Sequence, residues 1–436
     1  MNDLDRDPEL AAFAALRTDE GQALLAELRD HDPAQELALA TRLRRDHPAE
    51  LVSAALGQAR LRQRAAAKFG VDDARRMYFT PNGVEQATRT TVATYRAERF
   101  HALGVRSVAD LCCGIGGDAI ALARAGISVL AVDRSPLTCE VARANAAALG
   151  LDALIEVRCA EVADVDTAGY DAVFVDPARR GGRGRVFDPE AYSPPLSWAL
   201  EAARKAPYAA LKIAPGIPHE AVPEDVEAEW ISDGGDVKEA VLWFGDESTG
   251  ESTGESTGES TGESGSGTAP QPAPQPTPPP APQPASMRAT LLPTGATLHA
   301  PLAAMLPDPE PRPVGRYLYE PDGAVIRAHL VAEVARQVDG GLIDPMIAYV
   351  TSDTLHPTPY ATAYEITDQL PFNMKKLKAL LREREVGVLT VKKRGSAVEP
   401  EELRRKMKLQ GKRSATVFLT RVADAPTMLV GAPAVA

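Results

Sequence analysis

The stretch Asp110-Leu-Cys-Cys-Gly-Ile-Gly-Gly-Asp118 lies between a short apolar segment, 108–111, and a helix-forming segment, 119–125. Glycines at such a junction let the backbone turn tightly and approach a ligand closely. The Gly-x-Gly-x-x-Gly spacing of dinucleotide-binding turns is absent, and an acidic residue precedes the glycines. The stretch therefore predicts a strand, a ligand-binding turn and a helix. The alternative is a glycine-rich turn that serves packing alone.

Strands and helices alternate on the C-terminal side of this turn. Apolar segments predict strands at 108–111, 128–132, 154–159, 172–175 and 209–213. Helices are expected between them at 119–125, 136–149 and 197–205. This alternation is typical of an α/β fold with a doubly wound parallel sheet. Right-handed crossovers place a ligand at the carboxyl ends of the strands.

Two carboxylates at these strand ends indicate the kind of cofactor. Asp110, facing the turn, would repel a pyrophosphate and attract the ammonium group of an amino acid. Asp133, at the end of the second strand, can accept hydrogen bonds from both hydroxyls of a ribose. The combination favours S-adenosylmethionine over NAD.

Three motifs carry a resemblance to known enzymes. The segment from Asp110 to Asp118, Asp133 and Asp176-Pro177 resemble the motifs of class I S-adenosylmethionine-dependent methyltransferases. More narrowly, Phe79-Thr80-Pro81, Cys113 to Asp118 and Ala142 to Ala146 resemble trimethylguanosine synthases, which methylate an exocyclic guanine nitrogen in RNA caps. The likeness spans residues 78–215.

This resemblance implies a Rossmann-like methyltransferase sheet and S-adenosylmethionine as the cofactor. Asp110 and Gly114 would line its methionine end, Asp133 the ribose and Glu161 the adenine, while Thr80, Pro81 and Glu85 would close the pocket. The full set of expected cofactor residues is Thr80, Asp110, Cys112, Gly114, Gly116, Asp118, Asp133 and Glu161.

The motif Asp176-Pro177-Ala178-Arg179 follows the fourth strand and carries the expected catalytic residues Asp176, Pro177 and Arg179. In amino-methyltransferases an Asp or Asn at this place orients the target amine, and two prolines and an aromatic residue follow. Here Ala178 replaces the second proline and Arg179 the aromatic residue, which leaves the target atom open. A guanidinium can stack on a base or pair with a phosphate. The alternative is a surface arginine beside a strand-capping aspartate.

Asp-Pro-x-Arg is also similar to the Asp-Pro-Pro-Arg motif of 5-methyluridine methyltransferases. Those enzymes use a cysteine nucleophile after the fifth strand, where this chain has Lys212-Ile-Ala-Pro215. Covalent methylation of carbon is therefore disfavoured. Cys112 and Cys113 lie in the cofactor turn, where they fill space as small apolar residues.

Charge is distributed unevenly along the chain. Residues 372–421 hold 15 Lys or Arg and 5 Asp or Glu, a balance of 15 − 5 = +10, against −12 for the whole chain. Such asymmetry indicates contact with nucleic acid, although a pair of solvated helices would look the same. Lys392-Lys393-Arg394-Gly395 and Leu409 to Arg413 are similar to THUMP-like domains. The expected RNA-binding residues are Arg180, Arg183, Lys392, Lys393, Arg394, Lys412 and Arg413.

Four regions are expected. Residues 1–75 are helical, 76–300 form the methyltransferase domain, 301–350 connect, and 351–436 form a basic α+β domain similar to THUMP domains. Residues 246–286 combine four Glu-Ser-Thr-Gly repeats with a proline-rich stretch, a composition that cannot build a core. The apolar segments 237–244 and 287–292 on either side are expected to pair as a hairpin that carries this insertion.

Composition bounds the remaining choices. A chain of 436 residues needs more than one core. The four cysteines lack metal-ligand spacing, so no metal is expected, and the acidic N-terminus and short apolar runs predict a cytoplasmic protein without a membrane span. The sequence predicts an S-adenosylmethionine-dependent methyltransferase acting on a base nitrogen of RNA. The alternatives are a degenerate methyltransferase that only binds RNA, and an enzyme that methylates a protein or small molecule.

Overall fold

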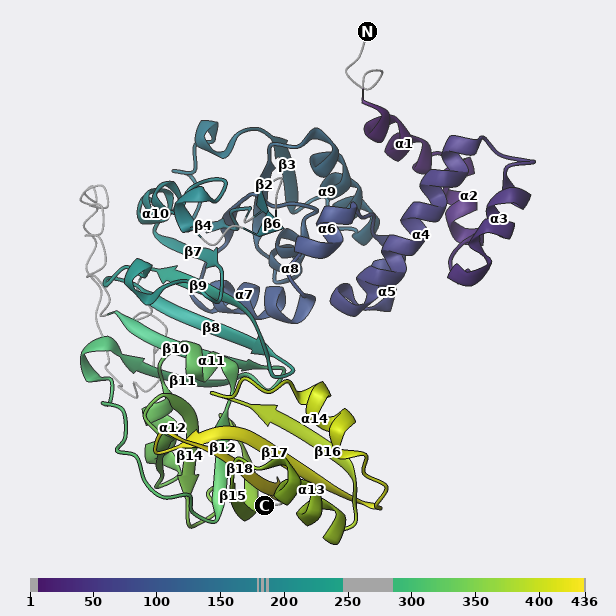
Figure 1. The fold of residues 1–436 in the computed structure, drawn as a ribbon. Helices are drawn as coiled ribbons and strands as arrows, with labels where there is room; N and C mark the ends of the chain where they lie inside the picture. Colours follow the sequence, from purple (N-terminus) through teal and green to yellow (C-terminus); the bar gives the residue numbers. More distant parts are fainter. Residues whose placement is uncertain (1–6, 179, 182–183, 186–187, 246–284, 435–436) are drawn as a thin grey trace, which may run out of the picture. The chain divides into compact units, whose positions relative to one another are not determined.

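The computed structural model describes residues 7–178, 180–181, 184–185, 188–245 and 285–434 (Figure 1). The chain divides into two compact units. The first unit comprises Met1–Leu211 and Trp243–Gln283, and the second comprises Lys212–Leu242 and Pro284–Ala436. Each unit has its own fold.

The first unit begins with helices, as expected. Asp7 caps the first of them by accepting a hydrogen bond from the Glu9 amide at 2.9 Å. Leu10, Phe13 and Leu16 recur at helical spacing and are buried. The helices are α1 (Pro8–Leu16), α2 (Asp19–Glu27), α3 (Glu36–Leu43), α4 (Ala49–Phe69), α5 (Val71–Arg76), α6 (Pro81–Gln86) and α7 (Thr90–Ala102).

The predicted parallel sheet follows these helices and confirms the α/β fold class. Its strands lie in the order β7-β4-β1-β2-β3, and all neighbouring pairs within this set are parallel. The strands are β1 (Ser107–Leu111), β2 (Ser128–Asp133), β3 (Ile155–Cys159), β4 (Ala172–Val175) and β7 (Tyr208–Ile213). The crossover helices are α8 (Gly117–Arg124), α9 (Pro136–Leu149) and α10 (Leu196–Arg204). A short hairpin, β5 (Arg180–Gly181) and β6 (Gly184–Arg185), follows β4.

The hairpin expected around residues 246–286 is wrong. Both flanking strands exist, as β9 (Asp236–Phe244) and β10 (Ser286–Leu292), but β8 (Glu227–Asp233) lies between them in the order β11-β10-β8-β9. β10 pairs in parallel with β8 and antiparallel with β11 (Ala296–Pro301). The sequence of β8 does not show the apolar pattern of a buried strand, because Glu227 and Glu229 alternate with its apolar residues. Polar groups of the neighbouring strand stabilise these glutamates.

Those polar groups lie on β10. Arg288 forms an ion pair with Glu227 at 2.8 Å, and the Thr290 hydroxyl donates to the buried Glu229 carboxylate at 2.5 Å. Buried carboxylates are tolerated when they are paired in this way. The pairing therefore places β8, instead of β9, beside β10.

The second unit also contains a seven-stranded sheet in the order β13-β14-β12-β15-β18-β17-β16. Residues 301–350, expected to connect, instead supply three of its strands and two helices. The strands are β12 (Tyr317–Pro321), β13 (Gly341–Asp344), β14 (Ile347–Ser352), β15 (Ala361–Pro371), β16 (Val386–Lys393), β17 (Arg413–Val422) and β18 (Ala425–Pro433). The helices are α11 (Gly323–Arg327), α12 (Val331–Gln337), α13 (Met374–Glu383) and α14 (Pro400–Met407).

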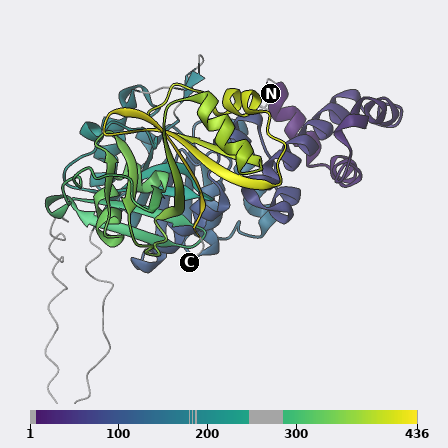
Figure 2. The ribbon, with the colours of Figure 1, turned by 60° about the horizontal axis from the view of Figure 1, so that its bottom comes forward.

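The two basic helices α13 and α14 lie on the same face of this sheet (Figure 2). Leu377 and Leu403 from these helices pack against Val417 of β17, whereas the adjacent Phe418 belongs to the core on the other face. Burial of the apolar sides leaves the charged sides of both helices in solvent.

Candidate active site

Three carboxylates meet at one edge of the parallel sheet. Asp110 lies in β1, Asp133 ends β2 and Asp176 directly follows β4. In the strand register Leu111 is opposite Val132 on one side and Val175 on the other. The Asp176 amide donates to the Leu111 carbonyl at 3.1 Å, which extends the ladder by one residue. The predicted gathering of these residues at the carboxyl ends of the strands is therefore observed.

This edge contains the point at which the strand order reverses. The chain proceeds from β1 through β2 to β3 on one side, and β4 then returns to the opposite side of β1. In doubly wound sheets the ligand crevice lies outside the carboxyl ends at such a point. Asp110 and Asp176 border it from the two adjacent strands.

The glycine-rich turn gives a ligand close access to the backbone. Cys112, Gly114 and Gly116 have φ values of 68°, 55° and 86°, in the left-handed region that favours glycine. A side chain at Gly114 would meet no atom within 4 Å, so open space lies beside this residue. A Cβ at Gly116 would instead lie 3.6 Å from Ala142 of α9. Gly114 therefore faces space for a ligand, and Gly116 lets the turn approach α9.

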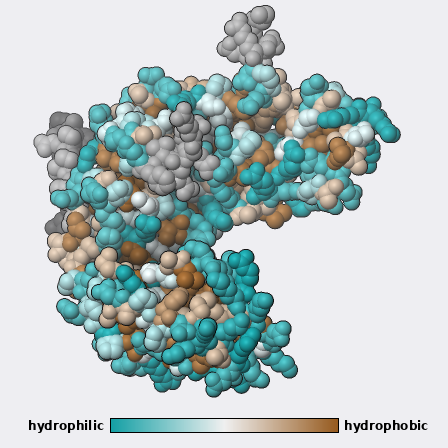
Figure 3. Space-filling view, in the orientation of Figure 1, coloured by the Kyte–Doolittle hydropathy of each residue, from teal (hydrophilic) through white to brown (hydrophobic). Residues whose placement is uncertain are grey.

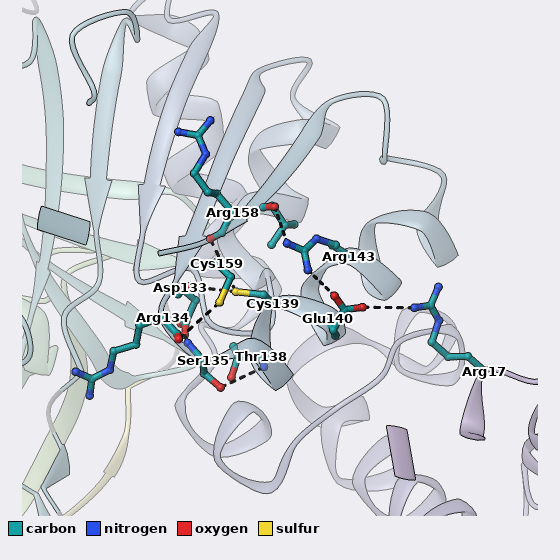
Figure 4. Close-up of polar contacts among 11 residues, drawn as sticks. Arg17, Asp133, Arg134, Ser135, Thr138, Cys139, Glu140, Arg143, Arg158 and Cys159 are labelled. Atoms are coloured by element: carbon teal, nitrogen blue, oxygen red, sulfur yellow. Dashed lines mark hydrogen bonds and ion pairs between the residues drawn. The ribbon is translucent and has the colours of Figure 1, made fainter. Parts of the chain in front are cut away.

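Asp133, drawn with Ser135 in Figure 4, is held in place by backbone amides. One oxygen, Oδ1, accepts a hydrogen bond from the Ser135 amide at 2.9 Å, and the other accepts from the Gly114 amide at 3.2 Å. Burial raises the pKa of Asp133, and these two hydrogen bonds oppose the effect. Each carboxylate oxygen can accept more than one hydrogen bond, so the oriented group can still accept from a diol.

Electrostatics identify Cys112 as the residue surrounded by the three carboxylates. Burial raises the pKa of its thiol, and the negative charges of Asp176, Asp133 and Asp110 raise it further, in that order. The pKa of Cys113 is also raised, again mainly by burial. A neutral thiol is a poor nucleophile, which agrees with the argument against covalent catalysis. The same concentration of negative charge favours a cationic ligand.

Helix α6 lies against the outside of the glycine turn. Thr80 caps it by accepting from the Gly83 amide at 2.9 Å, and a Cβ at Gly83 would lie 2.5 Å from the Ile115 side chain. Asn145 of α9 secures this arrangement: its amide exchanges two hydrogen bonds with the Tyr78 backbone and donates a third, of 3.0 Å, to the Ile115 carbonyl. Asn145 lies within the segment Ala142 to Ala146, which resembles trimethylguanosine synthases, and its hydrogen bonds give that segment a structural role.

Asp118 makes its contacts inside the protein. Its carboxylate accepts from the Thr88 hydroxyl at 2.7 Å and from Nε of Arg96 at 3.1 Å, and all three residues are buried. The Arg96 guanidinium lies 4.4 Å from the centre of the Phe174 ring. These contacts join α7 to α8 and β4. Its expected contact with the cofactor stays a prediction.

The other expected residues around the site are placed as follows. Glu161 is exposed just after β3, where the preceding Ala160 amide donates to the Asp133 carbonyl at 3.0 Å. Pro177 is buried, and Ala178 exchanges two backbone hydrogen bonds with Ser193. Arg180 contributes its backbone to β5. Arg179 and Arg183 lie outside the described residues.

The expected RNA-binding residues of the second unit form two groups at opposite ends of β16. At its carboxyl end, Lys392 and Arg394 both pair with Glu320, and Lys393 pairs with Glu399. At its amino end, Lys412 and Arg413 are exposed. The exposed residues of this region without an ion-pair partner among the described residues are Lys375, Lys376, Arg382, Arg405, Lys408, Lys412 and Arg413.

Fold and site together define the Rossmann-like methyltransferase class, with an acidic turn suited to S-adenosylmethionine. Family models match in three places. These are "Methyltransferase domain" at residues 108–178, "THUMP domain-like" at 361–433, and "Domain of unknown function (DUF8688)" at 7–65.

Relatives make the assignment specific. An uncharacterized S-adenosylmethionine-dependent methyltransferase of Mycobacterium tuberculosis is 33% identical over 375 residues, 83% of this chain and 90% of that protein. The chain therefore belongs to this family of S-adenosylmethionine-dependent methyltransferases. An uncharacterized RNA methyltransferase of Parasynechococcus marenigrum is 35% identical over 91 residues, 20% of each chain. The crystal structure of a putative methyltransferase from Porphyromonas gingivalis W83 has a similar fold, with a TM-score of 0.67 and 21% identity over 93% of this chain and 100% of that one.

The described part of the chain holds neither a candidate membrane-spanning helix nor a cluster of metal-binding side chains. None of its helices is both long enough and apolar enough to cross a membrane. Among the same residues, no group of three or more His, Cys, Asp or Glu side chains could hold a metal ion.

Proposed function

We propose that this methyltransferase transfers a methyl group to a base nitrogen of RNA, with Asp176 as the residue that orients the target. The observation that carries the proposal is the position of Asp176. It follows β4 at the reversal point of the sheet, hydrogen-bonded through its backbone to Leu111, and its charge is the largest electrostatic influence on the thiol of Cys112 in the cofactor turn. This position would put the catalytic group beside the cofactor turn, at the same edge of the sheet.

The acidic edge fits the cofactor's donor groups. Asp110 would attract the ammonium of the methionine part, the open space at Gly114 would admit that part, and Asp133 would accept from the ribose hydroxyls. When bound, S-adenosylmethionine supplies an electrophilic methyl group on a sulfonium. The negative charge around Cys112 favours such a cation.

The target nitrogen needs orientation more than activation. The Asp176 carboxylate would accept a hydrogen bond from the amine, which turns the nitrogen lone pair toward the methyl group. A backbone carbonyl near the buried Pro177 would accept the second N–H. Arg179 is proposed to stack on the base or to pair with a phosphate. A trimethylguanosine-type target stays a prediction.

RNA is the substrate that the second unit supports. The THUMP domain-like match spans residues 361–433, and one relative is named as an RNA methyltransferase. Exposed cations on α13, on α14 and before β17 supply charge for a polyanion, and hydrophilic side chains cover the region of these helices (Figure 3). We place the principal backbone contacts on Lys375, Lys376, Lys412 and Arg413, because Lys392, Lys393 and Arg394 already pair with glutamates.

Mass spectrometry of tRNA and rRNA nucleosides from a deletion strain tests the function. We expect one N-methylated nucleoside to disappear, and its restoration by the wild-type protein but not by Asp176→Ala. A protein that binds RNA yet leaves every nucleoside unchanged would be the degenerate RNA-binding protein. Methyl transfer to protein or small molecules alone would refute RNA as the substrate.

A further inference from the structure

The N-terminal helices of the first unit line an open cavity, and none of the carboxylates of the acidic edge belongs to its lining. Its volume is about 620 Å³, and α2, α4 and α5 supply most of its wall (Figure 1). This volume lies within the range of roughly 300–1,000 Å³ that is usual for small-ligand sites. The cavity falls largely in the part of the chain that matches only a domain of unknown function.

Four arginines give the cavity its chemistry. Arg29, Arg62, Arg75 and Arg76 line it, and Asp30 is its one acidic lining residue. Asp30 pairs with Arg75 at 2.7 Å. Among the described residues no carboxylate pairs with the other three arginines, although Arg62 donates to the Met77 carbonyl and Arg76 to that of Ala148. Arginine stays protonated in proteins, and such a cluster attracts an anion.

Arg62 is positioned at the inner wall of the cavity. Its Nε donates to the Met77 carbonyl at 2.9 Å, and its guanidinium lies 5.2 Å from the centre of the Tyr78 ring. Burial lowers the pKa of Arg62 and the positive charge of Arg29 lowers it further, while the neighbouring Tyr78 raises it in part. An anion bound to these two guanidiniums would offset both the desolvation of Arg62 and the repulsion between the two positive charges.

A second polar group of the wall lacks a partner. Nε2 of His31, which lines the cavity, is buried and makes no hydrogen bond with the described residues. The ring is fixed through Nδ1, which lies 3.0 Å from the Leu28 carbonyl. Since Nδ1–H donates to that carbonyl, Nε2 of the neutral ring is an acceptor, and a ligand hydroxyl such as that of a ribose would give it a partner.

We propose that this cavity binds a phosphate-bearing ligand of nucleotide size through Arg29, Arg62 and Arg76. A guanidinium group can donate two parallel hydrogen bonds to a pair of phosphate oxygens. A ligand with a single carboxylate would leave two of the three positive charges without a counter-charge, so a multiply charged phosphate fits better. The phosphate can come from an RNA strand or from a free nucleotide. The inference does not rest on RNA methylation, since a free nucleotide would occupy the cavity in either case.

The cavity also shares a residue with the support of the cofactor turn. Gln22 donates to the Tyr78 hydroxyl at 2.8 Å from the cavity side. The Tyr78 backbone bonds to Asn145, which in turn donates to the Ile115 carbonyl of the glycine turn. A ligand in the cavity would therefore contact Tyr78, whose backbone is hydrogen-bonded to Asn145 beside the glycine turn.

Binding by the full chain tests the proposal in two arms. Calorimetry with ADP measures the free-nucleotide source, and anisotropy of a fluorescent RNA oligonucleotide, with inorganic phosphate as competitor, measures the RNA source. Arg29→Gln removes an exposed guanidinium of the cavity and should weaken binding in at least one arm about tenfold, the effect of one charge-assisted hydrogen bond. Arg45→Gln is the matched control, because Arg45 is exposed among the same helices but does not line the cavity.

The outcomes separate clearly. Binding that Arg29→Gln weakens and Arg45→Gln leaves intact supports the site, and the responding arm identifies the source of the phosphate. Absence of binding in both arms up to millimolar ADP, or equal weakening by both variants, overturns it. S-adenosylmethionine affinity and melting temperature should match wild type in both variants. Loss of methyl transfer to RNA in a separate assay would not alter this result.

Discussion

The acidic edge of the first unit and the basic face of the second are charged in different ways. At the edge, Asp110, Asp133 and Asp176 come from three adjacent strand ends and lie in or near the protein interior. On the face, cations of α13, α14 and the segment before β17 are exposed, and several pair with nearby glutamates. The few fixed carboxylates of the edge suit one small cationic ligand, whereas the many exposed cations of the face suit a polyanion.

The difference teaches what each region can recognise. Charges in a low-dielectric crevice interact strongly with one small ligand and depend on position. Exposed charges interact weakly one by one, are screened by salt and can replace each other. We therefore expect single substitutions to have large effects at the edge and small ones on the face.

The largest effect is expected at Asp176. Asp176→Ala removes the acceptor that orients the target amine and should lower kcat by about 10²- to 10³-fold. Asp176→Asn keeps an acceptor and should lose less. Transfer of labelled methyl groups to RNA from a deletion strain measures this, and S-adenosylmethionine affinity should fall far less than kcat, because two of the three carboxylates around Cys112 remain. Asp152→Asn, at an exposed site of the same unit, is the control. Full activity of Asp176→Ala would remove Asp176 from the mechanism.

The second effect concerns the cofactor. Asp133→Ala removes the acceptor proposed for the ribose hydroxyls and should weaken S-adenosylmethionine binding by about 1–3 kcal/mol, roughly five- to 150-fold. Titration calorimetry measures the change. An unchanged affinity would show that the ribose lies elsewhere. Since Asp133 also accepts from Gly114 and Ser135, a melting curve must accompany the titration.

These sites differ in how far the sequence alone could predict them. The sequence predicts both ends of each central strand to within about one residue. It does so because buried parallel strands are short apolar runs between turn residues. The carboxylates followed from those strand ends. β8 was not predicted, because its glutamates conceal it and their partners lie some sixty residues away in β10.

For the basic motifs the sequence overestimates how many positive charges are free to bind RNA. Lys392-Lys393-Arg394 is one of two runs of three consecutive basic residues in the C-terminal region, yet Glu320, more than seventy residues earlier in the chain, neutralises part of it. Likewise α11 ends at Arg327 and α12 begins at Val331, with His329 at a φ of 58° between the two. Contacts that are distant in sequence and local backbone breaks do not appear in residue patterns.

On the basic face we expect a smaller effect that depends on the residue's partner. Lys412→Gln should weaken RNA binding a few-fold and reduce the slope of log affinity against log salt by about 0.7, the value for one phosphate contact with a single strand. Lys393→Gln is the matched control, since its ammonium already pairs with Glu399 at 2.5 Å. Filter binding at several salt concentrations separates the two. Equal slopes for both variants would contradict the distinction between paired and unpaired cations.

The pH dependence of cofactor binding should be modest and have a definite sign. Burial raises the pKa of Asp133 above its ordinary value of 3.8, so the group takes up a proton at a higher pH than an exposed aspartate does. Only the carboxylate can accept from both ribose hydroxyls. Affinity for S-adenosylmethionine should therefore be highest above the raised pKa and fall as the pH is lowered through it. Asp133→Asn should flatten the profile, and an identical profile in this variant would assign the titration to another group.

The smallest effect is expected from replacing residues 246–284. β9 and β10 both lie beside β8, so a connection between them must pass two strand spacings, about 9.6 Å. A two-residue Asn-Gly turn is too short for this distance, whereas a six-residue Gly-Ser connector can reach up to roughly 20 Å. Shortening the loop changes closure entropy by only about 0.6 kcal/mol per halving, in favour of the folded state. The melting temperature should thus stay equal or rise slightly, and cofactor affinity and methyl transfer should be unchanged. A variant that folds and binds cofactor but no longer methylates RNA would show that these residues do more than join two strands of one sheet.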